Sequence, residues 1–250
     1  MDFKKLRTLF VFIPLVTVYT IVCATVSCPL ALVFRSGEPS HQVARIWTWL
    51  ILKTCGVKVD IDGLDNIDHG RTYIFASNHQ SLFDIPILFT YLPVSFRILF
   101  KQSLLGLPFL GWHLWVSGHI PVDRSNPVKA RKSLERATEH VRNKGSIVVF
   151  PEGTRSCDGS IGRFKQGSFV LAVKGGVPVV PVTISESWRI MERGKVTVHP
   201  RTVRVHVAPP VDVADFDEPS VTELSRKVRD IIVRNYSSCS EETRLAGTEN

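Results

Sequence analysis

The sequence lacks the cysteine pattern of a disulfide-bonded or zinc-binding protein. Its 250 residues include five cysteines, and no two of them form a Cys-x-x-Cys pair. Two of the five, Cys23 and Cys28, lie inside an apolar segment. An odd, unpaired set of this kind is typical of a reducing compartment, and it predicts neither disulfides nor structural zinc.

Patterns that accompany nucleic-acid, metal or nucleotide binding are also missing. There is no recognition helix with a basic stripe and no interleaving of aromatic and basic residues, so the net charge of +8 does not indicate nucleic acid. Only Asp123 lies near the scattered histidines His113, His119, His199 and His206. No glycine-rich phosphate loop precedes a helix. We expect no metal, no cofactor and no nucleic-acid partner.

What the sequence does have is an excess of positive charge and enough apolar residues for a core. Lysine and arginine number 31 against 23 acidic residues, and 44% of the chain is hydrophobic. A basic balance suits anionic partners such as a phospholipid surface or a phosphorylated substrate. The length favours one domain with an appendage.

The appendage is an apolar segment near the N-terminus. From Thr8 to Phe34 there is no charged residue, and this run is long enough to cross a hydrocarbon core of about 30 Å. It exceeds the roughly 7–15 apolar residues of a signal peptide, which predicts an uncleaved anchor. Pro14 and Pro29 would kink or end a helix here, so a shallow, re-entrant or monotopic arrangement stays open. Basic residues flank both sides almost equally, and the charge count sets no orientation.

The rest of the chain alternates strand-like and helix-like segments. We predict strands at 57–61, 72–76, 94–100, 116–122, 146–150, 177–184, 196–199 and 203–207, and helices at 41–55, 85–89, 127–144, 165–174 and 219–236. This pattern predicts an α/β fold, with a mixed, largely parallel sheet, helices on both faces and a preceding N-terminal membrane-associated helical segment. We expect an anchor and helical segment at 1–56, a globular domain at 57–236 and a polar, disordered tail at 237–250.

A histidine and a carboxylate lie together at one of the predicted strand-to-helix junctions. The strand that ends at Ala76 is followed by the stretch SNHQSLFD, residues 77–84. On a regular helix, positions five apart lie about 140° apart around the axis. His79 and Asp84 therefore meet only if His79 lies in the loop and Asp84 lies in or beside the first helical turn.

Two interpretations of this junction remain open. Ser81 is a possible N-cap, but Pro86 would then cost a hydrogen bond, which favours Asp84 as the cap itself. As a dyad, Asp84 fixes the tautomer of His79, and His79 takes a proton from a substrate hydroxyl. Alternatively, Asp84 only caps the helix and His79 is a satisfied polar loop residue.

A second polar block, PEGTRS at 151–156, follows the predicted strand at 146–150. Proline and glycine suit a type I turn here, but a turn does not require the glutamate, threonine and arginine as well. The stretches NHQSLFD and FPEGTRS resemble the first and third signature blocks of the glycerolipid acyltransferase family, the 1-acylglycerol-3-phosphate acyltransferases in particular. GHIPVDR at 118–124 and VPVVPV at 177–182 are similar to the second and fourth blocks, in the expected order. The second block departs from the family pattern at His119-Ile120-Pro121, where aromatic or aliphatic residues are more usual.

The resemblance implies an O-acyltransferase of phospholipid biosynthesis. Its members move a fatty acyl chain from acyl-CoA or acyl carrier protein to the sn-2 hydroxyl of 1-acylglycerol-3-phosphate, which forms phosphatidate. By the same resemblance His79 is the general base and Asp84 orients it. Substrate binding falls to Glu152, Gly153, Thr154 and Arg155, with Arg124 and Lys101 at strand ends as further candidates. Arg155 is the main candidate for the acceptor phosphate, because guanidinium binds phosphate in bidentate fashion.

The implied partners are lysophosphatidate, an acyl-CoA or acyl carrier protein donor, and a membrane phospholipid surface. A cytosolic thioester donor would require the domain to face the cytosol from the inner or cytoplasmic membrane. Another acceptor is an alternative: glycerol-3-phosphate, a different lysophospholipid or a lyso-aminolipid. Other classes are a membrane-anchored lipid-binding protein without turnover and a hydrolase that uses the same dyad. The intact His79 and Asp84 argue against the binding protein.

Overall fold

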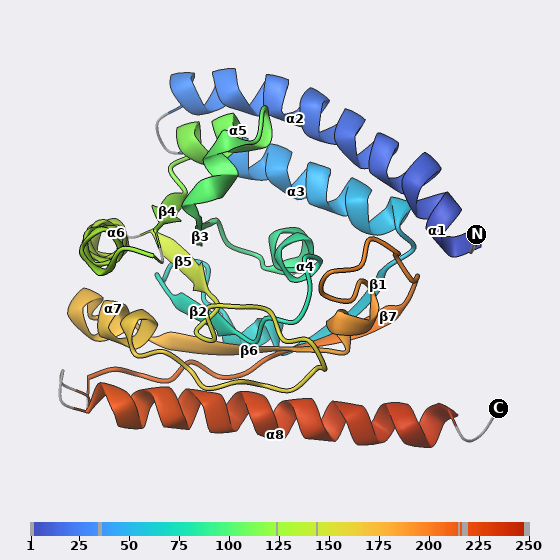
Figure 1. The fold of residues 1–250 in the computed structure, drawn as a ribbon. Coiled ribbons are helices and arrows are strands. Elements are labelled where there is room, and N and C mark those ends of the chain that lie inside the picture. The colour runs from blue at the N-terminus through green and yellow to red at the C-terminus, as the bar shows by residue number, and fades with distance from the viewer. Residues whose placement is uncertain are drawn as a thin grey trace.

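A seven-stranded sheet forms the centre of the molecule (Figure 1). The computed structural model describes residues 3–34, 37–123, 125–143, 145–214, 216 and 220–247. Its strands are β1 (Lys58–Asp62), β2 (Ile74–Ser77), β3 (Phe96–Lys101), β4 (Ile120–Val122), β5 (Ser146–Val149), β6 (Val179–Ser185) and β7 (Thr202–Val207). The strand order is β1-β7-β6-β2-β5-β3-β4. All neighbours are parallel except β6 and β7, so the predicted mixed, largely parallel sheet is confirmed.

Helices cover both faces of this sheet, as the sequence predicts. They are α1 (Phe3–Arg7), α2 (Ile13–Val33), α3 (Glu38–Thr54), α4 (Asp84–Tyr91), α5 (Leu110–Val116), α6 (Pro127–Arg142), α7 (Gly167–Gly175) and α8 (Val221–Gly247). A π-helical turn, η1 (Thr8–Phe12), joins α1 to α2, and short 3-10 turns are η2 (Leu64–Asn66), η3 (Gln102–Gly106) and η4 (Ser187–Arg189).

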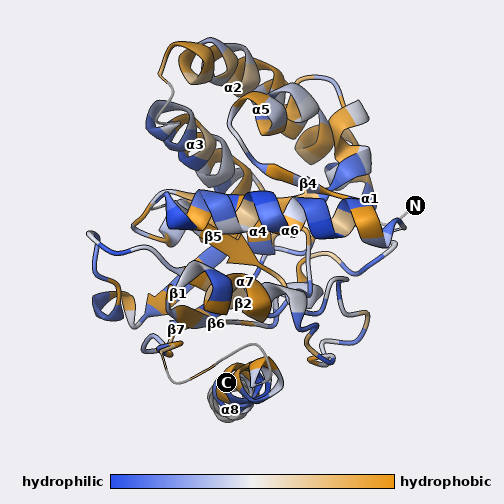
Figure 2. Cartoon of the chain, turned by 90° about the vertical axis from the view of Figure 1, so that its left-hand side faces the viewer, coloured by the Kyte–Doolittle hydropathy of each residue, from blue (hydrophilic) through white to orange (hydrophobic). Residues whose placement is uncertain are grey.

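Two hydrophobic cores lie on opposite faces of the sheet. One joins the sheet to α3 and α4, and the other joins it to α6, α7 and α8. The central strands β2, β5 and β6 are buried along their whole length, which explains their continuous apolar sequences. The polar outer side of α6 faces solvent, and its apolar side faces the second core (Figure 2).

Helix α2 forms an outer layer over α3 and α5 (Figure 1). Its buried residues are the small ones, Ala24, Ser27 and Ala31, so it packs closely on its neighbours. Together with α1 and η1 it makes a continuous helix, Phe3–Val33, that is long and apolar enough to cross a membrane. Only 11% of its most apolar window is buried inside the protein. The predicted apolar helix is therefore present, and most of its surface contacts no other part of the described chain.

Three expectations about secondary structure are corrected. The strand expected at 116–122 is shorter, because Val116 is the last residue of α5 and β4 begins only at Ile120. Residues 196–199 alternate like a strand but form none, because β7 already pairs with β1 on one side and β6 on the other. The backbone N–H of His199 instead donates to the carbonyl of Ile190. At the other end of the chain, α8 continues to Gly247, where we expected a helix end at Tyr236 and a tail without structure. No proline or glycine interrupts the chain between these two positions.

Candidate active site

The predicted site residues that the structure describes lie at one edge of the sheet, where the parallel strands end. In register, Ala76 of β2 is level with Val149 of β5 and Pro181 of β6, while Lys101 of β3 is level with Val122 of β4. The loops that carry the signature blocks therefore leave the sheet side by side. Loops at the carboxyl edge of an open α/β sheet are the usual place for a ligand site.

His79 and Asp84 make the side-chain contact that the dyad interpretation requires. The imidazole Nδ1 lies 2.8 Å from the Asp84 Oδ2, so Nδ1 carries the proton and donates it to the carboxylate. The same oxygen accepts the backbone N–H groups of Gln80 at 2.7 Å and Ser81 at 2.8 Å. Asp84 is fully buried, while the His79 side chain remains 15% exposed.

The capping prediction is wrong in detail. Helix α4 begins at Asp84, and its N-cap is Phe83, which makes no side-chain capping bond. Neither Ser81 nor Asp84 is the cap, because the Asp84 side chain turns back onto the loop that precedes the helix. The carboxylate thus satisfies loop N–H groups and the imidazole at the same time.

The His79 ring has a fixed orientation with one nitrogen left over. It stacks on Phe150 with ring centroids 4.0 Å apart and an interplanar angle of 23°. Within the described residues Nε2 has no hydrogen-bond partner, and it is not among the buried unpaired atoms. A neutral histidine held in this way presents a free lone pair to an incoming hydroxyl, and the aromatic face below it favours the imidazolium that would form.

Asn78, one residue earlier, ties the loop to the next strand. Its side-chain amide donates to the carbonyl of Ile184 at 2.8 Å, and its side-chain oxygen accepts the Ile184 N–H at 2.8 Å. Asn78 is completely buried. A side chain therefore continues the β2–β6 ladder past the end of β2, which fixes the starting point of the loop. The sequence does not predict this contact, because it joins residues 106 positions apart.

The predicted acceptor-binding residues occupy the loop after β5. Glu152 is buried, Thr154 is exposed and Arg155 is half-buried. Gly153 has a φ of +72°, a left-handed conformation that favours glycine. Both carboxylate oxygens of Glu152 accept backbone N–H groups. The Glu152 side chain is therefore bonded inside the protein, whereas the Thr154 side chain is exposed to solvent.

Two cations stand at this loop. Arg155 and Lys165 make no side-chain hydrogen bond or ion pair among the residues that the structure describes. The Lys165 stem lies on Gly153, where an added Cβ would be 2.8 Å from Nζ. The Lys165 N–H donates to the carbonyl of Pro151. Lys165 is missing from the sequence prediction, although its charge ten residues after Arg155 was a usable signal.

The other two predicted cations are Lys101 and Arg124. Lys101 is exposed at the end of β3, at the same sheet edge as the loop after β5. Arg124 lies outside the described residues. Between them in sequence, His119 of the second block is buried, and its Nδ1 accepts the Ile98 N–H at 3.2 Å. The unusual histidine in that block therefore has a structural partner in β3.

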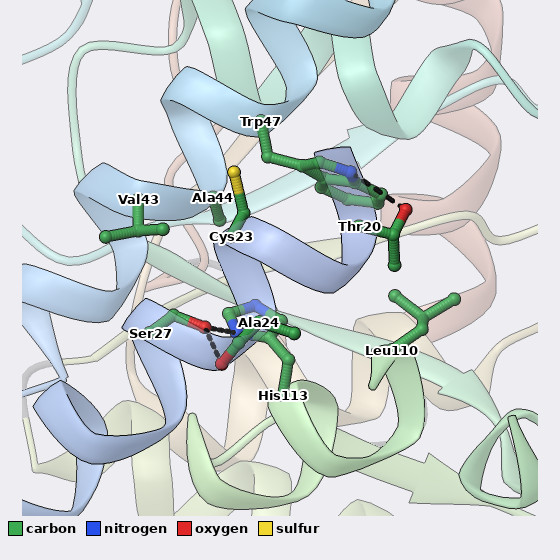
Figure 3. Close-up of a pocket in the computed structure, with 9 residues that line it drawn as sticks. All are labelled: Thr20, Cys23, Ala24, Ser27, Val43, Ala44, Trp47, Leu110 and His113. Atoms are coloured by element: carbon green, nitrogen blue, oxygen red, sulfur yellow. Dashed lines mark hydrogen bonds between the residues drawn. The ribbon is translucent and has the colours of Figure 1, made fainter. Parts of the chain in front are cut away.

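Two other buried histidines, His113 and His41, do not belong to the candidate site. Burial, followed by the nearby Arg97 charge, lowers the pKa of each to about 4. His113 lines a small cavity between α2, α3 and α5, where its Nδ1 lies 2.7 Å from the Ser27 hydroxyl (Figure 3). None of the predicted site residues lines this cavity. Among the residues that the structure describes, no three histidine, cysteine, aspartate or glutamate side chains lie close enough together to hold a metal ion.

Comparison with known proteins agrees with the geometry. The acyltransferase family model matches residues 58–185, and this match covers the dyad and the loop after β5. The chain therefore belongs to the acyltransferase family. Within that family it is similar to the 1-acyl-sn-glycerol-3-phosphate acyltransferases, so the resemblance found in the signature blocks is confirmed.

Three relatives illustrate this similarity. The chloroplastic 1-acyl-sn-glycerol-3-phosphate acyltransferase BAT2 of Brassica napus is 38% identical over 62% of this chain and 44% of its own length. The Saccharomyces cerevisiae enzyme is 31% identical over 90% of this chain and 76% of its own. The crystal structure of the Thermotoga maritima acyltransferase PlsC has a TM-score of 0.77 at 29% identity, covering 95% of this chain and 98% of that one. The chain thus spans about half the length of the chloroplastic relative.

Proposed function

We propose that this protein transfers a fatty acyl chain from acyl-CoA or acyl carrier protein to the sn-2 hydroxyl of 1-acylglycerol-3-phosphate, forming phosphatidate. The observation that carries the proposal is the His79 imidazole, with Nδ1 bound to Asp84 at 2.8 Å and Nε2 unpaired among the described residues. The names of the relatives support the choice of lysophosphatidate as acceptor.

The chemistry needs one base and no covalent enzyme intermediate. Nε2 of His79 takes the proton of the acceptor hydroxyl as its oxygen attacks the thioester carbonyl carbon. The tetrahedral intermediate collapses, the carbon–sulfur bond breaks, and the imidazolium returns its proton to the departing thiolate. Asp84 and the Phe150 ring hold and stabilise the imidazolium during this sequence.

The acceptor phosphate is placed at the loop after β5. Arg155 supplies a guanidinium, and Gly153 lets the Lys165 stem lie flat on the loop. Thr154 is exposed and available to the acceptor, and Lys101 and Arg124 belong to the same proposed site. A dianionic phosphate favours a cluster of cations without an acidic partner.

We expect Arg155→Gln to lower kcat/KM for lysophosphatidate by about 10- to 100-fold, because a hydrogen bond to a charged group contributes about 1.5–3 kcal/mol. The rate with an uncharged monoacylglycerol should not change. Radiolabelled acyl transfer in detergent micelles would measure both, with wild type preferring lysophosphatidate over glycerol-3-phosphate and the neutral lysolipid.

The matched control is Arg131→Gln on α6, where the native side chain is 83% exposed. An equal loss on charged and uncharged acceptors would remove Arg155 from the phosphate site. No phosphatidate from wild type would overturn the proposed function itself.

The N-terminal helix is proposed to lie in the plane of the membrane, with 1–56 as anchor and 57–236 as the acyltransferase domain facing the cytosol. Helix α2 packs along α3, which carries Arg45 and Lys53. If α2 spanned the membrane, Arg45 and Lys53 would lie closer to the hydrocarbon core. A charged side chain at the centre of the bilayer costs about 2.5–3.5 kcal/mol. Trp112 and Trp115 on α5 are 56% and 67% exposed, which suits a membrane interface.

Labelling of single cysteines at the two ends of the N-terminal helix would distinguish a helix in the membrane plane from one that spans the membrane. In a background without native cysteines, Lys5→Cys and Leu32→Cys should both react with an impermeant maleimide from the same side of sealed vesicles. Both positions are exposed in the protein, so the bilayer alone decides the access. Reaction of the two ends from opposite sides would show that the helix spans.

A further inference from the structure

Both oxygens of the Glu152 carboxylate are hydrogen-bonded to the backbone inside the protein. The side chain is 8% exposed. Its Oε1 accepts the His79 N–H at 2.8 Å, and its Oε2 accepts the Gly162 N–H at 2.9 Å. Burial raises the pKa of Glu152, while its bonds to the two backbone N–H groups oppose that shift. Because the side chain is buried and each oxygen faces a backbone donor, the carboxylate is turned into the protein and away from an incoming acceptor.

The loop after β2, which carries His79, and the loop after β5, which carries Glu152, are joined at two further points. The Ser156 N–H donates to the carbonyl of His79 at 2.9 Å, and the Gln80 side-chain amide donates to the carbonyl of Gly159 at 2.6 Å. Both backbone polar groups of His79 are therefore bound by the loop that begins at Pro151. The orientation of the base depends on this second loop as well as on Asp84.

The second loop is in turn held from the far side. Arg229 of α8 donates to the carbonyls of Gly162 at 2.9 Å and Ile161 at 3.0 Å. Gly162 also allows a close approach, because an added Cβ would be 3.1 Å from the Glu152 Oε2. A chain of contacts thus runs from α8 through Gly162 and Glu152 to the backbone of His79.

We propose that Glu152 is a positioning residue for His79 and does not contact the acceptor. The inference rests on the proposed function for its kinetic meaning. Glu152 fixes the backbone from which the imidazole projects, while Asp84 fixes the ring. Glu152 also places a second carboxylate near the imidazole, where positive charge develops as the hydroxyl proton is taken.

The test is Glu152→Gln, which keeps size but has only one acceptor oxygen for two N–H groups. We expect kcat to fall about 100-fold, since a small misplacement of a reacting group costs that much, with KM for lysophosphatidate unchanged. Hydrogen–deuterium exchange should accelerate in peptides that contain His79 and Gly162. Glu135→Gln, the same change at a site 63% exposed, should alter none of these.

Glu152→Asp keeps the charge but is too short to reach both donors, so it should be impaired as well. Full activity in Glu152→Asp, a raised KM with unchanged kcat in Glu152→Gln, or unchanged exchange at His79 would each overturn the proposal. If Glu152→Gln does not fold, Gln80→Leu removes a neighbouring contact between the loops and should show the same lower kcat and faster exchange. The exchange result stands even if wild type has no activity on lysophosphatidate, which separates this proposal from the proposed function.

Discussion

Replacement of His79 by alanine is expected to lower kcat by about 10²- to 10⁴-fold, the range for loss of a positioned general base. The reason is that a lipid hydroxyl is a poor nucleophile near neutral pH unless its proton is removed during attack. Binding should survive, because the phosphate cations lie on other loops, and KM for lysophosphatidate should change little. Initial rates of phosphatidate formation in micelles would measure both constants.

A second histidine provides the control for that experiment. His69 is exposed in the turn before β2, and His69→Ala should leave kcat at the wild-type value. Turnover unaffected by His79→Ala would refute the dyad and leave the family fold without an assigned base. The variant should still fold, because the buried Asp84 carboxylate keeps its two backbone N–H donors, and thermal unfolding would verify this.

The sequence predicts the sheet well because its strands follow simple rules. Buried parallel strands such as β5 are continuous apolar runs, and the edge strand β1 alternates. Residues 196–199 also alternate, but a strand needs a free neighbouring edge, and the described sheet offers none beside β7. Nor does alternation describe burial here, because Val198 is 5% exposed while Val196, two residues earlier, is 47% exposed. Pairing depends on the rest of the fold.

The site divides in the same way between local and long-range contacts. His79 and Asp84 are five residues apart, so local geometry was enough to say under which condition they would meet, and the structure meets that condition. The Asn78–Ile184 and Glu152–His79 contacts join residues 106 and 73 positions apart. Their partners are backbone groups, which carry no signal in the sequence. The sequence therefore suggests that Glu152 matters and cannot show that it acts on a backbone N–H.

Replacing Asp84 with asparagine is expected to lower kcat by about 10³- to 10⁴-fold while KM stays near wild type. The corresponding change in a serine-protease triad costs about 10⁴-fold because the histidine adopts the wrong tautomer. Here the Asp84 Oδ2 accepts from Nδ1 of His79 and from two backbone N–H groups. Because one oxygen accepts all three N–H groups, an asparagine can take either of two orientations. With its oxygen in the Oδ2 position it keeps the three bonds but carries no charge to stabilise the imidazolium. With its NH2 there it donates to Nδ1, moves the imidazole proton to Nε2 and leaves the N–H groups of Gln80 and Ser81 unpaired.

Two further variants separate the effect of Asp84 on the imidazole from simple stabilisation of the loop. Asp84→Ala removes the acceptor entirely, leaves two buried N–H groups unpaired, and should cost about 1–3 kcal/mol of stability for each. Asp84→Asn should lose activity with little loss of stability, and Asp65→Asn at an exposed position should lose neither. An Asp84→Asn protein that keeps wild-type kcat would show that Asp84 only holds the loop. If kcat falls in proportion to stability across Asp84→Asn and Asp84→Ala, Asp84 acts only by holding the loop. If Asp84 acts on the imidazole, the two variants should lose nearly equal kcat although their losses of stability differ.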